Sequence, residues 1–271
     1  MNISKNIIVL KCGGSTIDTL SDRFFTNIKK LQKAGFKPII VHGGGPTIEK
    51  VLEKENIGTE FVNGLRKTTE KVLDVVETVL TGVINNNMVR KLNQAKIKAV
   101  GLSGADAQLI QAEPIDLKKY GYVGNVSRVN VAFLHQLLQN DIVPVIAPIG
   151  IGKNGTRFNI NADTAAGAVA KAVRAKQLVF ITDVPGIMKD NQLLPSVTEQ
   201  EVKQLIQSGV ITGGMIPKVQ AALNSLGHEL QEAMIVDGNQ AVLSTADTKL
   251  VGTVIKKSVG VEAHVRSFSN V

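Results

Sequence analysis

The sequence predicts an α/β fold: a three-layer sandwich in which helices cover both faces of an open, mainly parallel sheet. Three observations lead to this prediction. At least six short runs of β-branched and aliphatic residues alternate with segments of helical spacing. A strand over 6–10, a helix over 24–34 and a strand over 37–41 form one unit, whose right-handed crossover makes its two strands parallel. Both strands end in glycine-rich turns, at the sheet edge where open α/β folds bind ligands.

These two turns are the most distinctive part of the chain. The first strand ends in Lys11-Cys12-Gly13-Gly14, and the second ends in His42-Gly43-Gly44-Gly45-Pro46. Pro46 suits the first turn of a helix, so a helix is expected to begin there. Glycines at such a junction leave backbone N–H groups open to a ligand, and N–H groups beside a helix N-terminus bind anions. A plain strand-to-helix turn is the alternative. His42 is expected to be a structural hydrogen-bond donor at its turn.

The remaining elements follow from hydrophobic periodicity and from capping residues. Gly35 is the expected stop of the first helix. Thr68 or Thr69 should cap a long helix to about Leu92, and Asn161 a helix ending near Ala175. Strands are expected over 99–102, 143–147, 177–182, 233–236 and 252–255, hairpins over 109–126, helices over 131–138 and 198–206, a turn over 183–186 and a helix start at 212–218.

Composition narrows the classes of function. The chain has 271 residues, 44% hydrophobic, which suits one large α/β domain or two fused lobes. The net charge is +8, but the 31 Lys and Arg residues are scattered, so a small anionic substrate explains the sign with fewer assumptions than nucleic acid does. Cys12, the single cysteine, excludes an internal disulfide and fits a reducing compartment. The apolar runs are too short for a signal peptide or a membrane span, so we expect a cytoplasmic protein with no membrane partner.

Charged side chains stand beside the glycine-rich turns. Lys11 ends the first strand, Lys218 lies at a helix start, and Asp163 lies in the first turn of the helix that Asn161 caps. Exposed lysines and simple capping are the alternatives, but two lysines with two N–H-rich turns would form a cradle for phosphate oxygens. The sequence has no Walker-type phosphate loop, no dinucleotide fingerprint and no metal-ligand spacing, so no protein metal ligand is predicted.

In order and spacing, these motifs resemble those of the amino acid kinase family over nearly the whole chain. Besides the two glycine-rich turns they are Asn63-Gly64-Leu65-Arg66, Asn159-Ile160-Asn161-Ala162-Asp163, Thr182-Asp183-Val184-Pro185-Gly186 and Gly214-Met215-Ile216-Pro217-Lys218. The first two of these sets are specific to the branch that phosphorylates N-acetyl-L-glutamate. The resemblance implies ATP-dependent phosphorylation of the γ-carboxylate of N-acetyl-L-glutamate, which gives N-acetyl-L-glutamyl 5-phosphate in arginine biosynthesis. It also implies a single domain in which residues 1–175 bind acetylglutamate and residues 176–271 bind ATP.

The resemblance assigns catalytic roles to charged groups and to backbone N–H groups. Lys11 and Lys218 would stabilise the charge on the transferred phosphoryl group from opposite sides. The N–H groups of Gly13, Gly14 and Gly44 would bind the same oxygens. Asp163 would hold both ammonium groups by charge-assisted hydrogen bonds. Because a carboxylate nucleophile is already ionised at neutral pH, no general base is expected.

The resemblance also assigns residues to the two substrates. Arg66 would clamp the α-carboxylate of acetylglutamate, Asn159 would bind its α-carboxylate or acetamido end, and Gly44 and Gly45 would line its site. Mg²⁺ would be held mainly by the phosphates of ATP and by water. The nucleotide would lie over the C-terminal half of the chain, against Asp183, Val184, Pro185, Gly186, Ile187, Met188, Val210, Ile211 and Thr212.

Several alternatives stay open at this point. N-acetyl-α-aminoadipate kinase of lysine synthesis would share most motifs, since one extra methylene in the substrate is not readable from the sequence. A non-catalytic nucleotide or metabolite sensor on the same fold would not need both lysines and Asp163. The loop 103–107 departs from the usual family pattern and is assigned no role. The first strand begins about six residues from Met1, without room for the N-terminal helix by which arginine-inhibited members form hexamers, so a homodimer insensitive to arginine is expected.

Overall fold

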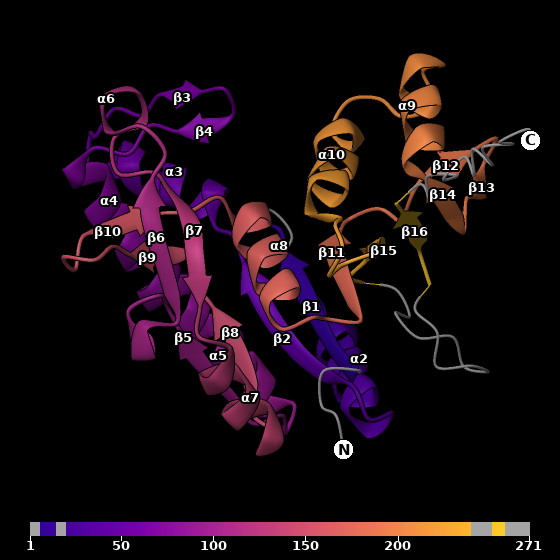
Figure 1. Cartoon of the computed structure of the whole chain (residues 1–271), viewed down its shortest axis with the longest axis horizontal. Helices are drawn as coiled ribbons and strands as arrows, with labels where there is room; N and C mark the ends of the chain where they lie inside the picture. Colours follow the sequence, from indigo (N-terminus) through magenta and orange to yellow (C-terminus); the bar gives the residue numbers. More distant parts are fainter. Residues whose placement is uncertain (1–5, 15–19, 240–250, 258–271) are drawn as a thin grey trace, which may run out of the picture.

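The computed structural model describes residues 6–14, 20–239 and 251–257, and it confirms the three-layer sandwich (Figure 1). Its centre is an eight-stranded sheet in the order β14-β16-β15-β11-β1-β2-β8-β5. Neighbouring strands are parallel except for β15 and β16. The strands are β1 (Ile7–Cys12), β2 (Lys37–His42), β5 (Ala99–Leu102), β8 (Val143–Ile146), β11 (Gln177–Thr182), β14 (Ser196–Thr198), β15 (Glu232–Asp237) and β16 (Thr253–Lys256).

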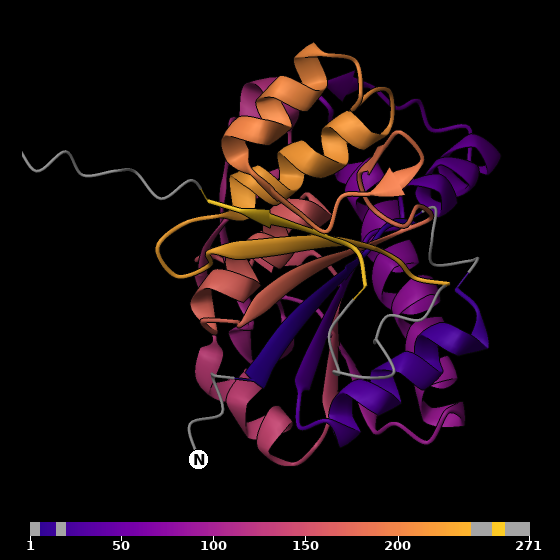
Figure 2. The ribbon, with the colours of Figure 1, turned by 90° about the vertical axis from the view of Figure 1, so that its right-hand side faces the viewer.

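Helices cover both faces of this sheet, and each face has its own hydrophobic cluster (Figure 2). One face packs against α2 (Asp22–Lys33), α3 (Gly45–Lys54) and a long helical run formed by α4 (Glu70–Glu77), η2 (Thr78–Asn85) and α5 (Asn86–Gln94). The other face packs against α7 (Val131–Gln139), α8 (Ala162–Ala172), α9 (Glu199–Gln207) and α10 (Met215–Ser225).

Alternation along the strands decides which helix layer each side chain meets. In β1, Val9 belongs to the cluster on the α8 side and Leu10 to the cluster on the opposite side. Successive side chains of a strand point to opposite faces, so Lys11 points to the α8 side. In β2, Ile40 belongs to the cluster on the α4–α5 side, and His42 follows it to that side. The two side chains that end these strands therefore meet different helix layers.

Local backbone chemistry sets the helix ends where the sequence predicted them. Gly35 follows α2 with a φ of +84°, a conformation that glycine adopts without strain, so the predicted stop is confirmed. The Thr69 hydroxyl accepts the N–H of Val72, so Thr69 rather than Thr68 caps α4. The Asn161 side chain accepts the N–H groups of Asp163 and Thr164, as predicted for the cap of α8.

The long helix predicted to end near Leu92 ends at Gln94, and its middle part, η2, is π-helical. Hydrophobic spacing did not predict this segment. A π-helical turn places more residues in one turn than an α-helical turn does, and it often occurs near functional sites. Here it ends at Asn85, a polar side chain that is 4% exposed.

Several short strands were not predicted. A second sheet has the order β10-β9-β6-β7, and its antiparallel pair β6 (Ile110–Pro114) and β7 (Gly124–Val129) confirms the predicted hairpin excursion. The unpredicted strands have two or three residues each, too few for an alternating pattern. They are β3 (Phe61–Val62), β4 (Leu65–Arg66), β9 (Ile149–Ile151), β10 (Arg157–Asn159), β12 (Met188–Lys189), β13 (Gln192–Leu193) and β14. Across the described ranges, no helix combines the length and the apolar character that a membrane span requires.

Candidate active site

Seven residues predicted as catalytic or substrate-binding line one cavity of about 290 Å³. Cys12 lies opposite His42 in the parallel pair β1–β2, so both glycine-rich turns leave the sheet at the same edge, as the sequence predicted. The seven residues are Lys11, Gly14, Gly44, Gly45, Arg66, Asn159 and Asp163.

Lys11 forms an ion pair with Asp163, with 2.7 Å between Nζ and Oδ1. The lysine comes from the face of β1 that α8 covers, and the carboxylate comes from the first turn of α8. The Lys11 side chain is 16% exposed and that of Asp163 is 32% exposed, so the pair lies partly out of water, where charge-assisted hydrogen bonds are stronger. The pair holds an ammonium group at the cavity wall.

The two glycine-rich turns touch each other. A Cβ atom on Gly14 would lie 2.8 Å from the nitrogen of Gly45 and 2.9 Å from that of Gly44, closer than real Cβ atoms come. The close approach therefore requires glycine at position 14. Among the described residues, the N–H groups of Gly44 and Gly45 have no acceptor. Unpaired N–H groups at the start of a helix attract anions, so this end of α3 can bind phosphoryl oxygens.

Arg66 is held in place before any substrate arrives. Its side chain is 7% exposed and donates to Thr59 Oγ1 at 2.8 Å and to Glu49 Oε1 at 3.2 Å. Its guanidinium also lies over the ring of Phe61, 4.6 Å from the centroid. A guanidinium has five N–H donors, so donors remain for a ligand carboxylate.

Thr68 connects Arg66 and Asn159, the two side chains predicted to bind acetylglutamate. Its hydroxyl donates to the carbonyl of Arg66 at 2.7 Å and accepts from Asn159 Nδ2 at 3.1 Å. The side chain is completely buried, and its backbone bonds to the segment around Tyr120. The side-chain amide of Asn159 thus keeps its oxygen Oδ1 and one N–H for a ligand. Thr68 holds this amide at a fixed distance from the backbone of Arg66.

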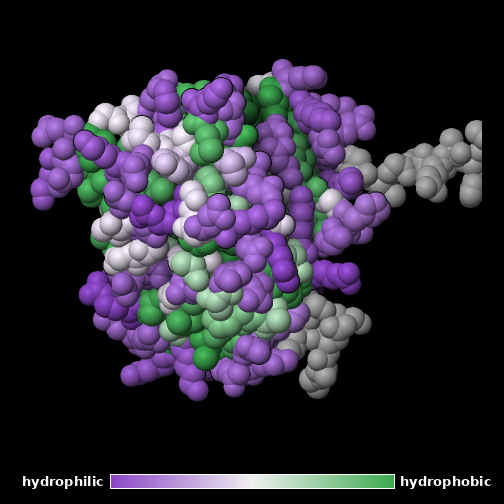
Figure 3. All heavy atoms as spheres, turned by 60° about the vertical axis from the view of Figure 1, so that its left-hand side comes forward, coloured by the Kyte–Doolittle hydropathy of each residue, from purple (hydrophilic) through white to green (hydrophobic). Residues whose placement is uncertain are grey.

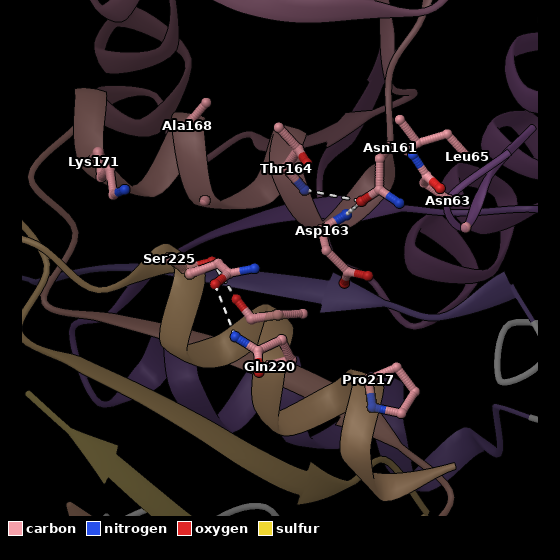
Figure 4. Close-up of a pocket in the computed structure, with 14 residues that line it drawn as sticks. Asn63, Leu65, Asn161, Asp163, Thr164, Ala168, Lys171, Pro217, Gln220 and Ser225 are labelled. Atoms are coloured by element: carbon pink, nitrogen blue, oxygen red, sulfur yellow. Dashed lines mark hydrogen bonds between the residues drawn. The ribbon is translucent and has the colours of Figure 1, made fainter. Parts of the chain in front are cut away.

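A larger cavity of about 580 Å³ lies between α8 and α10 and shares Asp163 with the first cavity (Figure 4). Lys171 and Thr164 of α8 line one wall, and Pro217 and Gln220 of α10 line the other. In Figure 4 the carboxylate of Asp163 extends from α8 toward α10. This cavity therefore separates Asp163 from the start of α10.

The resemblance implied that Asp163 would hold both ammonium groups, but in the structure Asp163 contacts Lys11 and not Lys218. Lys218 instead donates to Asp183 Oδ1 at 2.8 Å, because the start of α10 lies beside the turn that follows β11. The hydrogen bond from Lys218 lowers the pKa of Asp183. Lys218 lines neither of the two cavities, so the structure brings together one of the two predicted catalytic lysines with Asp163.

The segments predicted to contact the nucleotide lie outside the first cavity. Gly186 and Ile187 are buried and shape the turn: the Ile187 N–H donates to Thr253 Oγ1 at 2.8 Å, and a Cβ on Gly186, whose φ is +145°, would meet the same oxygen at 2.5 Å. The predicted residues divide by exposure: Asp183, Met188 and Thr212 are exposed, Val184, Pro185 and Val210 are half-buried, and Gly186, Ile187 and Ile211 are buried.

Two buried titratable groups lie behind the turns. His42 donates from Nδ1 to the Gly43 carbonyl at 3.0 Å, so the predicted structural donor is confirmed. Burial lowers the pKa of His42 to about 4, so the ring is neutral at neutral pH. Burial also raises the pKa of the Cys12 thiol to about 12, which keeps it protonated and inert.

Sequence reasoning missed the residues that hold the predicted ones. Glu49, Thr59 and Phe61 support Arg66, and Asn85 bonds to His42. The Asn63-Gly64 pair was a usable signal, because this dipeptide favours the tight turn that joins β3 to β4 and folds Phe61 back over Arg66.

Known proteins resemble this chain in sequence and in structure. A family model described as the amino acid kinase family matches residues 6–237. An acetylglutamate kinase of Halalkalibacterium halodurans is 52% identical over 254 residues, covering 94% of this chain and 97% of that protein. The crystal structure of smu.665 from Streptococcus mutans UA159 superposes with a TM-score of 0.80 at 35% identity, covering 93% of this chain and 99% of that one. Carbamate kinase from Giardia lamblia bound to AMP-PNP shares the fold, with a TM-score of 0.68 at 18% identity over 95% of this chain and all of that one.

Proposed function

The chain belongs to the amino acid kinase family, and we propose that it transfers the γ-phosphoryl group of ATP to the γ-carboxylate of N-acetyl-L-glutamate in arginine biosynthesis. The observation that carries the proposal is the single cavity in which Lys11, both glycine-rich turns and Arg66 meet. It offers cationic and N–H groups to a phosphoryl group and a guanidinium to a second anionic group. Relatives at about 50% identity that are named acetylglutamate kinase support this choice of substrate.

The reaction requires that the two substrates be positioned and that the charge on the transferred phosphoryl group be stabilised. A γ-carboxylate oxygen forms a bond to the γ-phosphorus of ATP, the bond from that phosphorus to the bridging oxygen breaks, and ADP leaves. The carboxylate is ionised at neutral pH, so no residue has to remove a proton. Lys11 and the N–H groups of Gly13, Gly14 and Gly44 would stabilise the charge on the phosphoryl oxygens. Asp163 would act as a positioning residue that holds the Lys11 ammonium.

The opposite end of the substrate would be bound by groups that are already in place. Arg66 would direct its remaining N–H donors to the α-carboxylate, because a planar guanidinium matches a carboxylate. The carbonyl oxygen and free N–H of Asn159 would bind the acetamido group or the α-carboxylate. Gly44 and Gly45 would line the space between the two ends.

The C-terminal part of the chain would bind the nucleotide. We propose that residues 1–175 form the acetylglutamate lobe and residues 176–271 the ATP lobe, with nucleotide contacts at 183–188 and 210–212. Lys218 lies beside Asp183 and would exchange this carboxylate for phosphate oxygens when ATP binds. Mg²⁺ supplies charge neutralisation when bound. The described residues contain no group of three acidic, His or Cys side chains suited to a metal, so we assign the ion to the ATP phosphates and water.

We further propose that the protein is a cytoplasmic homodimer. Hydrophobic residues gather in the lower half of the face seen in Figure 3. Apolar area of this kind on a surface is typical of contacts between proteins, which supports a second copy as the partner. Sedimentation equilibrium of the full chain should give twice the mass of the monomer, and a monomer at micromolar concentration would contradict the proposal.

Trapping of the acyl phosphate with hydroxylamine tests the reaction. The protein is incubated with Mg-ATP and, in parallel, N-acetylglutamate, N-acetyl-α-aminoadipate, glutamate, aspartate and carbamate. We expect a strong signal with N-acetylglutamate, its loss in Lys11→Met, and an unchanged signal in Lys203→Met, which alters an exposed lysine of α9. Preference for the longer acetylated acid would move the protein to lysine synthesis. Binding of ATP without any product would favour the sensor alternative.

A further inference from the structure

The second glycine-rich turn is held from behind by two buried polar side chains that the reaction does not use. His42 is fully buried at the end of β2, and Asn85 is 4% exposed at the end of η2. Asn85 Nδ2 lies 3.0 Å from His42 Nε2, and His42 Nδ1 lies 3.0 Å from the Gly43 carbonyl oxygen. Asn85 Nδ2 also donates to the carbonyl of Val145 in β8 at 2.9 Å. A continuous chain of hydrogen bonds thus runs from the sheet to the turn.

The partners determine the direction of each hydrogen bond. A carbonyl oxygen only accepts, so the hydrogen of the His42 ring is on Nδ1. The ring is neutral at neutral pH, since burial lowers the pKa of His42 to about 4, and Nε2 therefore accepts. Asn85 supplies both hydrogens of its amide, one to Nε2 and one to Val145. Every donor in the chain has one acceptor, which leaves a single tautomer for His42.

This chain sets the orientation of one peptide plane. The carbonyl of Gly43 and the N–H of Gly44 belong to the same planar trans peptide and point in opposite directions. His42 binds that carbonyl on the α4–α5 side, so the Gly44 N–H points away from this side. Gly44 lines the cavity that holds Lys11, and its N–H has no acceptor among the described residues. The turn thus presents this donor to the cavity with its direction fixed.

The packing around Asn85 requires small residues at two places. A Cβ on Gly101 of β5 would lie 1.9 Å from Asn85 Oδ1, so the amide fits only because residue 101 is glycine. A Cβ on Gly44 would lie 2.4 Å from Ile84 Cδ1 and 2.7 Å from Leu80 Cδ2, so η2 rests directly on the turn. Asn85 is the last residue of the π-helical segment η2, which places its amide between Gly101 and His42. An apolar side chain could fill the same space. What the amide of Asn85 adds is its two hydrogen bonds, to His42 and to Val145.

We propose that Asn85 is a positioning residue for phosphoryl transfer: through His42 it orients the Gly43–Gly44 peptide so that the Gly44 N–H points at the transferred group. This inference rests on the proposed function. Asn85 touches neither substrate, so its loss should lower kcat and leave the KM for acetylglutamate nearly unchanged.

Kinetics of three variants test the role. Asn85→Leu removes both donors and should lower kcat on the order of 10- to 100-fold, the loss typical of residues that orient metal ligands by hydrogen bonds. Asn85→Asp keeps the shape of the side chain, but a carboxylate cannot donate to His42 Nε2, so its kcat should fall as far as that of Asn85→Leu. Asn86→Leu is the matched control, because Asn86 is the exposed neighbour on the same helix, and its kcat should stay within about twofold. An Asn85→Leu enzyme with wild-type kcat, or with only a raised KM, would overturn the proposal.

A second pair of variants separates positioning from folding. His42→Asn retains an N–H donor near the place of Nδ1, whereas His42→Leu does not, so His42→Asn should keep a kcat about tenfold higher. Equal kcat values in the two variants would contradict the role.

The nitrogen-15 signals of the His42 ring test the geometry without any substrate. We expect the neutral Nδ1-protonated form in the wild type and a proton on Nε2 in Asn85→Asp. A proton on Nε2 in the wild type would overturn the inference. A wild-type enzyme that makes no acyl phosphate would instead overturn the proposed function, so the two failures are distinguishable.

Discussion

The two sides of the proposed reaction centre are built in different ways. On the N-terminal side, the side chains of Lys11 and Arg66 are only 16% and 7% exposed. Lys11 is held by Asp163, and Arg66 has three partners, Glu49, Thr59 and Phe61. On the C-terminal side, Lys218 is 32% exposed, and its described partner, Asp183, is 72% exposed. The side proposed to bind acetylglutamate is thus preorganised, whereas the side proposed to bind the nucleotide is open to solvent.

This difference has a physical consequence for catalysis. Donors that are already fixed need no rearrangement in the transition state, so they stabilise charge at little cost. An exposed ion pair is weak because water screens it, so the Lys218 ammonium can leave Asp183 for a phosphate group. A rigid side suits recognition of one small acid, and an open side suits binding of ATP and release of ADP.

Replacement of the two lysines gives the largest expected effects and tests the comparison directly. Lys218→Ala should cost about 3–4 kcal/mol of transition-state stabilisation, roughly two to three decades in kcat, with little change in the free energy of unfolding. Lys11→Ala should lose as much kcat and also about 1–3 kcal/mol of unfolding free energy, because Asp163 is left without its partner. Steady-state kinetics and urea unfolding measure the two quantities. Unchanged turnover in Lys218→Ala would refute its role, and equal stability losses would refute the comparison.

The buried support behind the rigid side makes stability depend on pH. The pKa of His42 is about 4 in the folded protein and close to 6.5 in the unfolded chain. Between these pH values the unfolded state binds more protons than the folded state. The contribution of His42 to the free energy of unfolding is therefore fully present above pH 6.5 and decreases as the pH falls. The loss from this group should reach about 3 kcal/mol at pH 4. His42→Asn has no group that titrates there, so its stability should decline less steeply; a parallel decline would show that His42 is not the cause.

Variants of Arg66 test whether the rigid side binds acetylglutamate rather than ATP. Arg66→Ala should raise the KM for acetylglutamate roughly 30- to 150-fold, about 2–3 kcal/mol, while the KM for ATP stays the same. Arg66→Lys should restore little, since an ammonium lacks the planar fork. Lys67→Ala removes an exposed neighbour that pairs with Glu60 and serves as the control. A larger rise in the KM for ATP than for acetylglutamate would refute the clamp.

Asp183 on the open side should give the smallest change in stability. The hydrogen bond from Lys218 lowers the pKa of Asp183, so this pair contributes above the carboxyl's ordinary pKa and is lost as the pH falls through the lowered value. Because the carboxylate is exposed, Asp183→Asn should change the free energy of unfolding by less than about 1 kcal/mol, and added salt should shrink that change. Because Asp183 is also a proposed contact of the nucleotide, the KM for ATP of Asp183→Asn should rise severalfold, whereas Glu232→Gln, an exposed partner of Lys256, should leave it unaltered. A stability loss well above that limit would mean that the pair is structural.

Local patterns predicted the elements and residue types of the site well. The strand over 177–182 and the strand over 99–102 have the predicted bounds, and Asn161 caps α8 as expected. Hydrophobic spacing and capping act over a few neighbouring residues, so they can be read directly. The strands of two or three residues were missed because such short runs show no alternating pattern, and β14 in addition pairs with β16, which lies more than 50 residues further along the chain.

Supporting residues were harder to predict than the residues they support. Asn85 reads as an ordinary polar position in a long helix, and only the π-helical turn and its packing on Gly101 bring it to His42. Thr68 reads as a helix cap, yet it connects Arg66 to Asn159. Such contacts depend on how helices and loops pack across the sheet.

The sequence by itself determined the order of strands and helices, the glycine-rich turns at the ends of β1 and β2, and which charged groups stand beside them. These features arise from backbone sterics, capping and side-chain alternation, which act between near neighbours. The family resemblance already implied the contact between Asp163 and Lys11. Only the tertiary structure decided that Lys218 pairs with Asp183 and that a buried amide bonds to His42 behind the second turn. Ion pairs and hydrogen bonds act over a few ångströms, so which groups meet depends on how the layers pack, a property that residue spacing along the chain does not contain.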